Sequence, residues 1–305
     1  MNLLEKTNLI IALSILLIGA TCFGQTVYGN SELPAGAFLW LPGDAATEAL
    51  GGAATANGGI SSGWANPAAL FEGTEIVAGA TYGYLREKTT NSGLFVSKRR
   101  GNWAGATRLF LVNSVDIEAR TGPTEEPDYY FAAHQLYLQM TGARRFGKYI
   151  DLGFSAKWIR EDIDQFDREG WVFDVGAAGG YKFFRAGIAV NNWGGKEVYF
   201  EDYRENYPIT YRAGLSVKIM DYGMLTADWI KPDRIGGYTA IGAEGYVTEY
   251  LILRAGYTPG HDTRNISAGL GVNYAGFNID YALANYSNNL GMSHTVTLSY
   301  SRKAN

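Results

Sequence analysis

The sequence predicts an all-β fold, an antiparallel transmembrane β-barrel of about 14 strands with a short N-terminal plug (hatch) segment. Apolar and polar residues alternate along many segments, as in strands with two different faces. The chain has 39 Gly, 21 Tyr and 14 Phe but only 8 Pro, a profile typical of strands and tight turns. Its mean hydropathy of −0.12 is compatible with a barrel, because each strand averages an apolar and a polar face.

Residues 1–24 are typical of a secretory signal peptide. A polar start with Lys6 is followed by an apolar stretch at residues 9–19 and by small residues at 21–24. We expect cleavage before Gln25. Because Cys22 is the one cysteine of the chain, the mature protein would need neither disulfides nor thiol chemistry.

Residues 25–73 form the predicted hatch segment. The part from residue 33 onward is rich in Ala and Gly and lacks strand alternation, so short helical turns and loops are expected there. Asn66 and Pro67 predict a rigid turn, because proline fixes its own φ and the Asn side chain can bond nearby backbone. Small residues around Gly51 would let this segment pack closely inside a barrel.

Residues 74–305 read as strands and turns throughout. Between residues 265 and 274, one face is apolar, with Ile266, Ala268, Leu270, Val272 and Tyr274. The other face is small or polar, with Ser267, Gly269, Gly271 and Asn273. Such segments are expected to start near Ile76, Gly93, Trp103, Phe131, Ile150, Trp171, Arg185, Ile209, Met224, Tyr238, Leu251, Ile266, Phe277 and Ser293. Their even number suits a bacterial single-chain barrel.

The predicted connections alternate between short and long. Tight links are expected at residues 100–102, 146–149, 183–184, 221–223, 247–249 and 275–276. Long polar links are expected at residues 86–92, 116–128, 162–169, 192–207, 231–236, 259–264 and 285–291. Short turns on one rim and long loops on the other distinguish an outer-membrane barrel, with both termini in the periplasm, from a soluble propeller or sandwich.

The inward faces of these strands carry charged side chains. The predicted lumen-facing polar residues are Lys157, Asp174, Arg212, Lys218, Asp228, Arg254 and Asp280. We expect these groups mainly to pair with one another and so keep a wet interior satisfied, rather than to contact a substrate.

The sequence shows no catalytic constellation, and we expect no enzyme, metal site or cofactor. His134, His261 and His294 lie on different segments, and no nucleophile elbow or phosphate loop is present. The acidic run at residues 161–167 lacks calcium-loop spacing and is interpreted as a solvated external loop. The net charge of −4 argues against nucleic acid as a partner.

The N-terminal segment resembles the signature of the PorV/PorQ family, a branch of the FadL-type outer-membrane barrels. In that family a Gly-Gly-Ala stretch precedes a Trp-Asn-Pro-Ala-Gly-Leu-like motif ahead of the first strand. The matching residues are Gly51, Gly52, Ala53, Trp64, Asn66, Pro67, Ala68 and Leu70. The resemblance implies that this segment plugs the lumen from the periplasmic side.

The resemblance also implies location, partners and function. It places the chain in the bacterial outer membrane, in contact with outer-membrane lipid. As a PorV/PorQ-like protein it would act in protein secretion or surface display of the type IX kind, with secretion components or secreted cargo as partners. The alternatives are a FadL-like channel for uptake of hydrophobic small molecules through a hatch-gated lumen and a lateral opening, and a purely structural outer-membrane protein.

Overall fold

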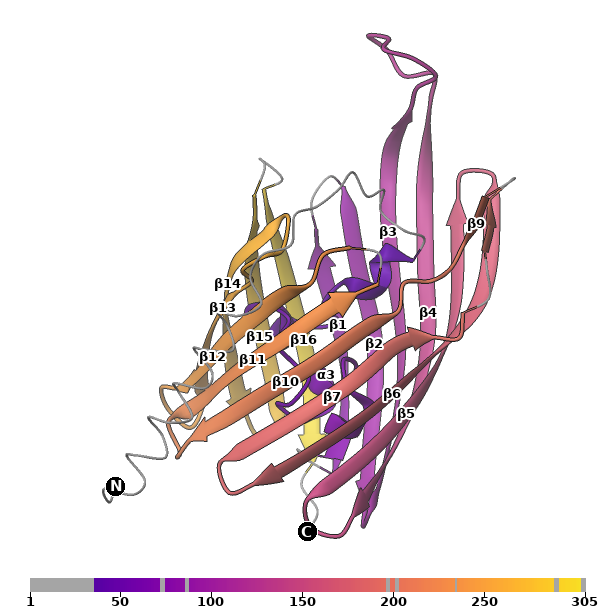
Figure 1. Cartoon of the computed structure of the whole chain (residues 1–305). Helices are drawn as coiled ribbons and strands as arrows, with labels where there is room; N and C mark the ends of the chain where they lie inside the picture. The colour runs from indigo at the N-terminus through magenta and orange to yellow at the C-terminus, as the bar shows by residue number, and fades with distance from the viewer. Residues whose placement is uncertain are drawn as a thin grey trace.

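A computed structural model shows a closed antiparallel barrel of 14 strands around a short N-terminal segment (Figure 1). It describes residues 36–71, 75–85, 88–195, 198–200, 203–233, 235–287 and 291–302. The predicted signal peptide and cleavage site lie outside the described residues. The predicted fold class is confirmed.

The barrel strands follow one another around the wall in chain order. They are β1 Ile76–Tyr84, β2 Thr89–Arg100, β3 Trp103–Ala119, β4 Tyr129–Phe146, β5 Ile150–Ile163, β6 Phe166–Tyr181, β7 Phe184–Trp193, β10 Thr210–Ile219, β11 Gly223–Pro232, β12 Tyr238–Tyr246, β13 Leu251–Tyr257, β14 Arg264–Tyr274, β15 Phe277–Tyr286 and β16 Met292–Arg302. The first and last strands pair from Ile76 with Arg302 to Tyr84 with His294. This pairing closes the sheet and removes its edges, which is the condition for a sheet to lie in hydrocarbon.

Four short helical elements lie inside the barrel, where Figure 1 shows them in indigo and purple. They are η1 Ala37–Trp40, α2 Ala45–Ala49, α3 Ile60–Gly63 and η2 Pro67–Phe71. Among the residues described, no helix is long and apolar enough to cross a membrane. Residues 36–71, which we call the hatch, therefore occupy the space that the wall encloses.

The two faces of the wall differ as the alternation predicts. On β14, Ile266 and Tyr274 point outward and are 58% and 71% exposed, whereas Ser267 is buried on the inside. Apolar side chains without cover recur around the outer face, for example Leu94 at 62% and Ile150 at 55%. An exposed apolar surface on this scale is stable only against lipid.

The two rims also differ as expected. Short turns join β2 to β3, β4 to β5, β6 to β7, β10 to β11, β12 to β13 and β14 to β15, and β1 begins and β16 ends at the same rim. In bacterial outer-membrane barrels this rim faces the periplasm and the long loops face outside. We use the terms periplasmic and external in that sense.

One predicted external loop is wrong, because residues 162–169 belong mainly to strands. β5 continues to Ile163 and β6 already starts at Phe166. Opposite charges face each other across this hairpin: Arg160 lies 2.8 Å from Asp167, and Arg168 lies 3.0 Å from Glu161. Such cross-strand pairs extend the ladder beyond the apolar belt, so the acidic run is not a solvated loop.

Other predicted boundaries shift at the external rim. β2 and β4 start at Thr89 and Tyr129, before the expected positions, and the β3–β4 hairpin rises well above the barrel (Figure 1). The expected loop at residues 192–207 contains a small hairpin of β8 Val198–Phe200 and β9 Tyr203–Glu205. Strands of three residues carry too little alternation to be recognised in a sequence.

Candidate functional site: the plugged lumen

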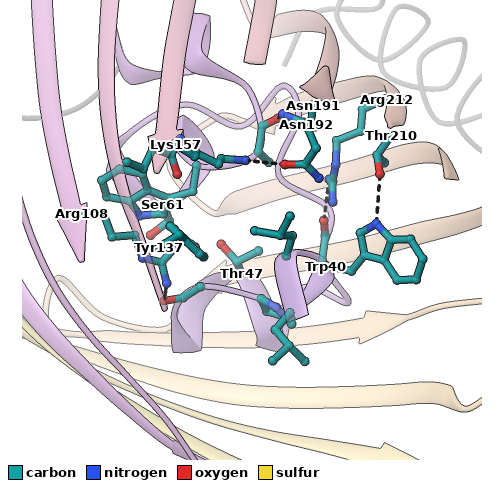
Figure 2. Close-up of a pocket in the computed structure, with 18 of the residues that line it drawn as sticks. Trp40, Thr47, Ser61, Arg108, Tyr137, Lys157, Asn191, Asn192, Thr210 and Arg212 are labelled. Atoms are coloured by element: carbon teal, nitrogen blue, oxygen red, sulfur yellow. Dashed lines mark hydrogen bonds between the residues drawn. The ribbon is translucent and has the colours of Figure 1, made fainter. Parts of the chain in front are cut away.

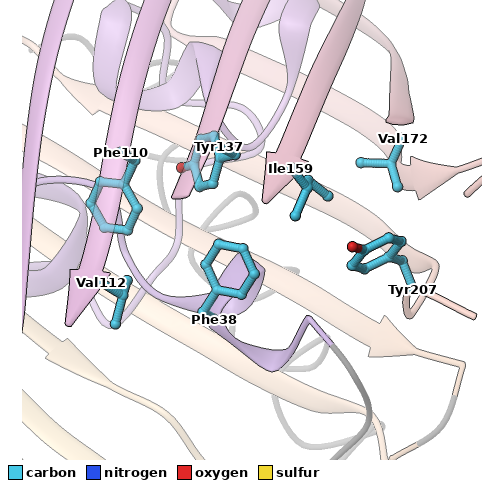
Figure 3. Close-up of a cluster of buried hydrophobic side chains, with 7 residues drawn as sticks. All are labelled: Phe38, Phe110, Val112, Tyr137, Ile159, Val172 and Tyr207. Carbon is cyan, nitrogen blue, oxygen red and sulfur yellow. The ribbon is translucent and has the colours of Figure 1, made fainter. Parts of the chain in front are cut away.

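The hatch crosses the barrel lengthwise and packs an apolar cluster at each end. In the external half, Phe38 of η1 packs among wall residues that include Phe110 and Tyr137, with ring centroids of Phe38 and Tyr137 6.1 Å apart (Figure 3). Tyr207, which follows β9, closes this cluster, and burial raises the pKa of its phenol above the ordinary value. In the periplasmic half, Trp64 lies 6.2 Å from Phe95 and packs with Phe71.

Between these clusters, Asp228 of β11 holds the middle of the hatch. Its Oδ2 accepts hydrogen bonds from the backbone N–H groups of Ala54 and Thr55, both at 2.8 Å, and from the Thr55 hydroxyl at 2.6 Å. Arg212 lies 3.6 Å from the same carboxylate. The carboxylate therefore accepts hydrogen bonds from two buried N–H groups of the hatch, which belongs to no β-sheet that could pair them.

Helix α2 is anchored to the opposite wall through Glu48. Its buried carboxylate accepts hydrogen bonds from Ser293, at 2.5 Å, and from Thr295, both on β16. Arg264 of β14 donates to the Glu48 carbonyl at 2.8 Å. Asp44 caps the helix by accepting from the Thr47 N–H at 2.9 Å, so the helix is fixed at its start and at its side.

The Gly-Gly-Ala part of the motif ends this helix. Gly51 and Gly52 have φ of +71° and +87°, and the Gly52 N–H donates to the Thr47 carbonyl at 2.9 Å. This is the left-handed termination that glycine favours. Ala53 follows fully buried against Ile230 and Ala240 of the wall.

The Trp-Ala-Asn-Pro part forms the predicted turn. The Asn66 side-chain oxygen accepts from the Ala68 N–H at 3.1 Å, and its amide donates to the Thr55 carbonyl at 2.8 Å. The same amide reaches the Ala177 carbonyl of β6 at 3.2 Å. Asn66 thus ties two parts of the hatch to each other and to the wall, and Leu70 packs in the apolar cluster beyond it.

The wall meets the hatch with glycine at several inward positions. A Cβ at these positions would overlap hatch backbone or side-chain atoms; they are Gly153, Gly176, Gly187, Gly214, Gly242, Gly256 and Gly269. Gly176, for example, faces the Asn66 side chain, and Gly187 faces the Thr55 carbonyl. These strands come closer to the hatch than any side chain would permit.

The predicted lumen-facing set divides into three charged groups and the separate residue Lys218. Arg212 and Asp228 contact the hatch as described above. Arg254 lies 2.6 Å from both Glu244 and Asp280, in a network on the wall. Lys218 has inward parity but is exposed at the periplasmic mouth.

Lys157 and Asp174 form a third group at an irregularity in the wall. Lys157 Nζ lies 2.9 Å from Asp174 and donates to the Asn192 side chain at 2.9 Å. The pairing of β6 with β7 shifts register after Phe173, and Asn192 has a φ of +60°. Asp174 accepts from the Asn192 N–H at 2.9 Å, so the carboxylate replaces a ladder bond that the bulge removes.

A cavity of about 70 Å³ remains between the hatch and the wall in the external half (Figure 2). Its lining mixes rings with polar groups: Trp40, Trp64, Tyr137 and Tyr238 among the rings, and Arg108, Lys157 and Arg212 among the cations. Trp40 is fixed by its indole N–H, which donates to Thr210 at 3.1 Å. The guanidinium of Arg108 donates to the Gly43 carbonyl and stacks 4.2 Å from the Phe110 ring centre.

Two buried groups of the hatch contact, Glu48 and Arg108, were not among the site residues predicted from the sequence. Arg108 has the inward parity of Ala104 and Ala106 on the same strand, so strand alternation was a usable signal. Glu48 lies in a helix of five residues, which offers no periodicity. Its partners lie more than 200 positions away in the chain, so only the fold reveals them.

The closed sheet, the apolar outer belt and the segment inside the lumen define an outer-membrane β-barrel with a plugged lumen, located in the bacterial outer membrane. Solved structures with this fold include a mutant of TodX described as a monoaromatic hydrocarbon channel, with a TM-score of 0.64 and 12% identity, covering 86% of this chain and 99% of that one. A FadL homologue from Pseudomonas aeruginosa gives a TM-score of 0.60 and 12% identity, covering 85% of this chain and 98% of that one. The shared feature is the FadL-type fold.

Comparisons by sequence give no such relative. No protein-family model matches the chain, and no curated protein matches it. The PorV/PorQ resemblance therefore rests on the N-terminal motif alone.

Proposed function

We propose that the protein is a channel that admits hydrophobic small molecules across the outer membrane, with the hatch as its gate. The observation that carries this proposal is the hatch itself, a separate segment that fills the lumen and leaves a cavity against the wall that is lined by aromatic rings together with cationic and polar side chains. A structural protein needs no removable filling of this kind. The fold of the TodX and FadL-type channels supports the same interpretation.

The contacts of the hatch suit a gate. Within the described residues, hydrogen bonds and not a covalent cross-link hold the hatch to the wall. They include the bonds of Asp228 with Ala54 and Thr55 and those of Glu48 with Ser293 and Thr295. A hydrogen bond to a carboxylate contributes about 1.5–3 kcal/mol net, so the proposed opening releases part of the segment by breaking a few of these bonds and not all of them at once. The present cavity of about 70 Å³ is far below the several hundred Å³ of typical ligand pockets. Entry of a ligand therefore requires that part of the hatch moves away from the wall.

The secretion role expected from the PorV/PorQ-like motif finds no support in the comparisons, and the channel alternative takes its place as the leading proposal. A pull-down of the native protein from its outer membrane separates the two. Recovery of secretion components or cargo carrying a C-terminal signal domain would favour secretion, whereas co-purified lipid alone would favour the channel.

Deletion of residues 33–72 tests the gate. In reconstituted liposomes the deleted barrel should pass small polar solutes such as arabinose, because nothing else among the described residues fills the lumen along its length. The intact protein should exclude them, and it should speed the uptake of toluene by cells whose lipopolysaccharide outer leaflet retards hydrophobic solutes. Heat-modifiable migration on gels verifies that the deleted barrel is folded. Unchanged solute entry into liposomes with a folded deletion variant would show that the segment does not plug.

A further inference from the structure

The periplasmic mouth of the barrel holds a basic hollow beside the hatch. The hollow has a volume of about 160 Å³ and lies between the β4–β5 turn, the β6–β7 turn and the end of β10. Five cationic side chains line it, Arg145, Lys148, Lys182, Arg185 and Lys218, with Asp151 as the one carboxylate. Its lining therefore has a formal net charge of +4.

The two arginines and the carboxylate form the fixed inner wall of this hollow. Asp151 is 1% exposed and accepts hydrogen bonds from Arg145 at 2.7 and 2.9 Å and from Arg185 at 3.1 Å. This bidentate arrangement is strong and rigid. The carboxylate is therefore committed to the arginines and is not available to neutralise the lysines.

The three lysines are exposed, and none has a carboxylate partner in the part of the chain that the structure describes. Lys148 and Lys182 stand in neighbouring turns, and Lys218 faces them from β10. Lysines gathered at one hollow repel one another unless an anion lies between them. The geometry thus provides several donors converging on a space large enough for a phosphate group.

Aromatic side chains place this hollow at the membrane interface. Tyr149, which lines the hollow in the β4–β5 turn, and Tyr181, at the end of β6, are 54% and 61% exposed, and their rings meet edge to face with centroids 5.8 Å apart. The Lys182 ammonium lies 5.3 Å from the Tyr181 ring centre, so one cation of the hollow reaches the lipid-facing side of the rim. Exposed Tyr rings in barrels lie at the level of the lipid headgroups.

A second cation lies near aromatic rings at the periplasmic end of β4. Arg144 faces outward from β4, with its guanidinium 4.9 Å from the ring centres of both Trp103 and Phe146. The external hairpin tip of β5 and β6, in contrast, carries Asp162, Asp164, Asp167 and Glu169. Positive charge next to interfacial rings is therefore a property of this part of the periplasmic rim.

We propose that this hollow binds the phosphate of an anionic phospholipid from the inner leaflet of the outer membrane. The headgroup of this lipid would reach over the periplasmic rim between the β4–β5 and β6–β7 turns. Charge complementarity requires an anion, and the rings fix the hollow at the depth where lipid phosphates lie. The bound lipid would brace the mouth of the lumen beside Asn57 of the hatch, which also lines the hollow.

The test compares retention of phosphatidylglycerol and phosphatidylcholine by the purified full-length protein, measured by native mass spectrometry. The variant K148Q/K182Q/K218Q removes the three positive charges while keeping polar, flexible side chains. The matched control K88Q/R120Q/K231Q removes three cations from the external rim. Wild type and control should retain phosphatidylglycerol at least about tenfold better, and the periplasmic variant should lose this preference.

Three results would overturn the proposal. The periplasmic variant could keep the full preference, the control could lose it equally, or excess inorganic phosphate could displace the lipid and so identify the hollow as a site for free phosphate. Heat-modifiable migration of both variants verifies that a lost preference does not come from an unfolded barrel.

Discussion

At the scale of single residues, the glycines on the inner face of the wall determine how closely the hatch packs. Inward glycines let the hatch backbone lie directly on the strands, where Asp228 and Asn66 supply the polar bonds. At these positions the hatch backbone contacts the wall without intervening side chains, whereas elsewhere Phe38 and Trp64 pack among wall side chains.

Gly176→Ala should disturb this fit. The added methyl would overlap the Asn66 side chain and lie 3.2 Å from Pro67 Cδ. Overpacking of this kind costs about 1–3 kcal/mol, so the hatch should loosen and arabinose entry into liposomes should rise. Gly142→Ala is the matched control, because a Cβ there meets nothing within 4 Å. Equal solute exclusion by both variants would show that close packing at Gly176 does not hold the hatch.

At the scale of elements, alternation in the sequence was enough to find every barrel strand in order, because each strand lies between lipid and lumen. The prediction lost accuracy where the chain leaves the membrane. Above the apolar belt the β5–β6 hairpin is held by ion pairs such as Arg160 with Asp167, so its sequence looks like a solvated loop. Strand ends stabilised by charge have no hydrophobic period to detect.

The orientation of the strands can be tested by labelling single cysteines. Thr124→Cys lies in the long β3–β4 connection and Asn102→Cys in the short β2–β3 turn, and both positions are exposed. A membrane-impermeant maleimide should label Thr124→Cys in intact cells and Asn102→Cys only after the outer membrane is permeabilised. The reverse pattern would mean that the long loops face the periplasm.

At the scale of the whole molecule, the plugged lumen depends on contacts between residues far apart in the chain, which no local sequence pattern predicts. Thr55 meets Asp228 and Asn66 meets Ala177 across 173 and 111 positions of the chain. The motif pointed to the segment and its turn, but which wall residues receive it follows from the order of strands around a closed barrel. For the same reason, alternation placed Asp228 on the inner face without indicating its hatch partner.

A disulfide between hatch and wall should close the proposed channel. Leu50 Cβ lies 2.9 Å from a Cβ built at Gly242, slightly closer than the roughly 3.5–4.5 Å of a disulfide, so a small shift would permit the bond. Cells whose outer leaflet is lipopolysaccharide, which retards hydrophobic solutes, should take up toluene no faster with the oxidised double variant Leu50→Cys/Gly242→Cys than without the protein, and reduction should restore uptake. Each single variant controls for the substitution itself. Toluene entry at the wild-type rate through the oxidised pair would mean that passage does not require the hatch to leave this strand.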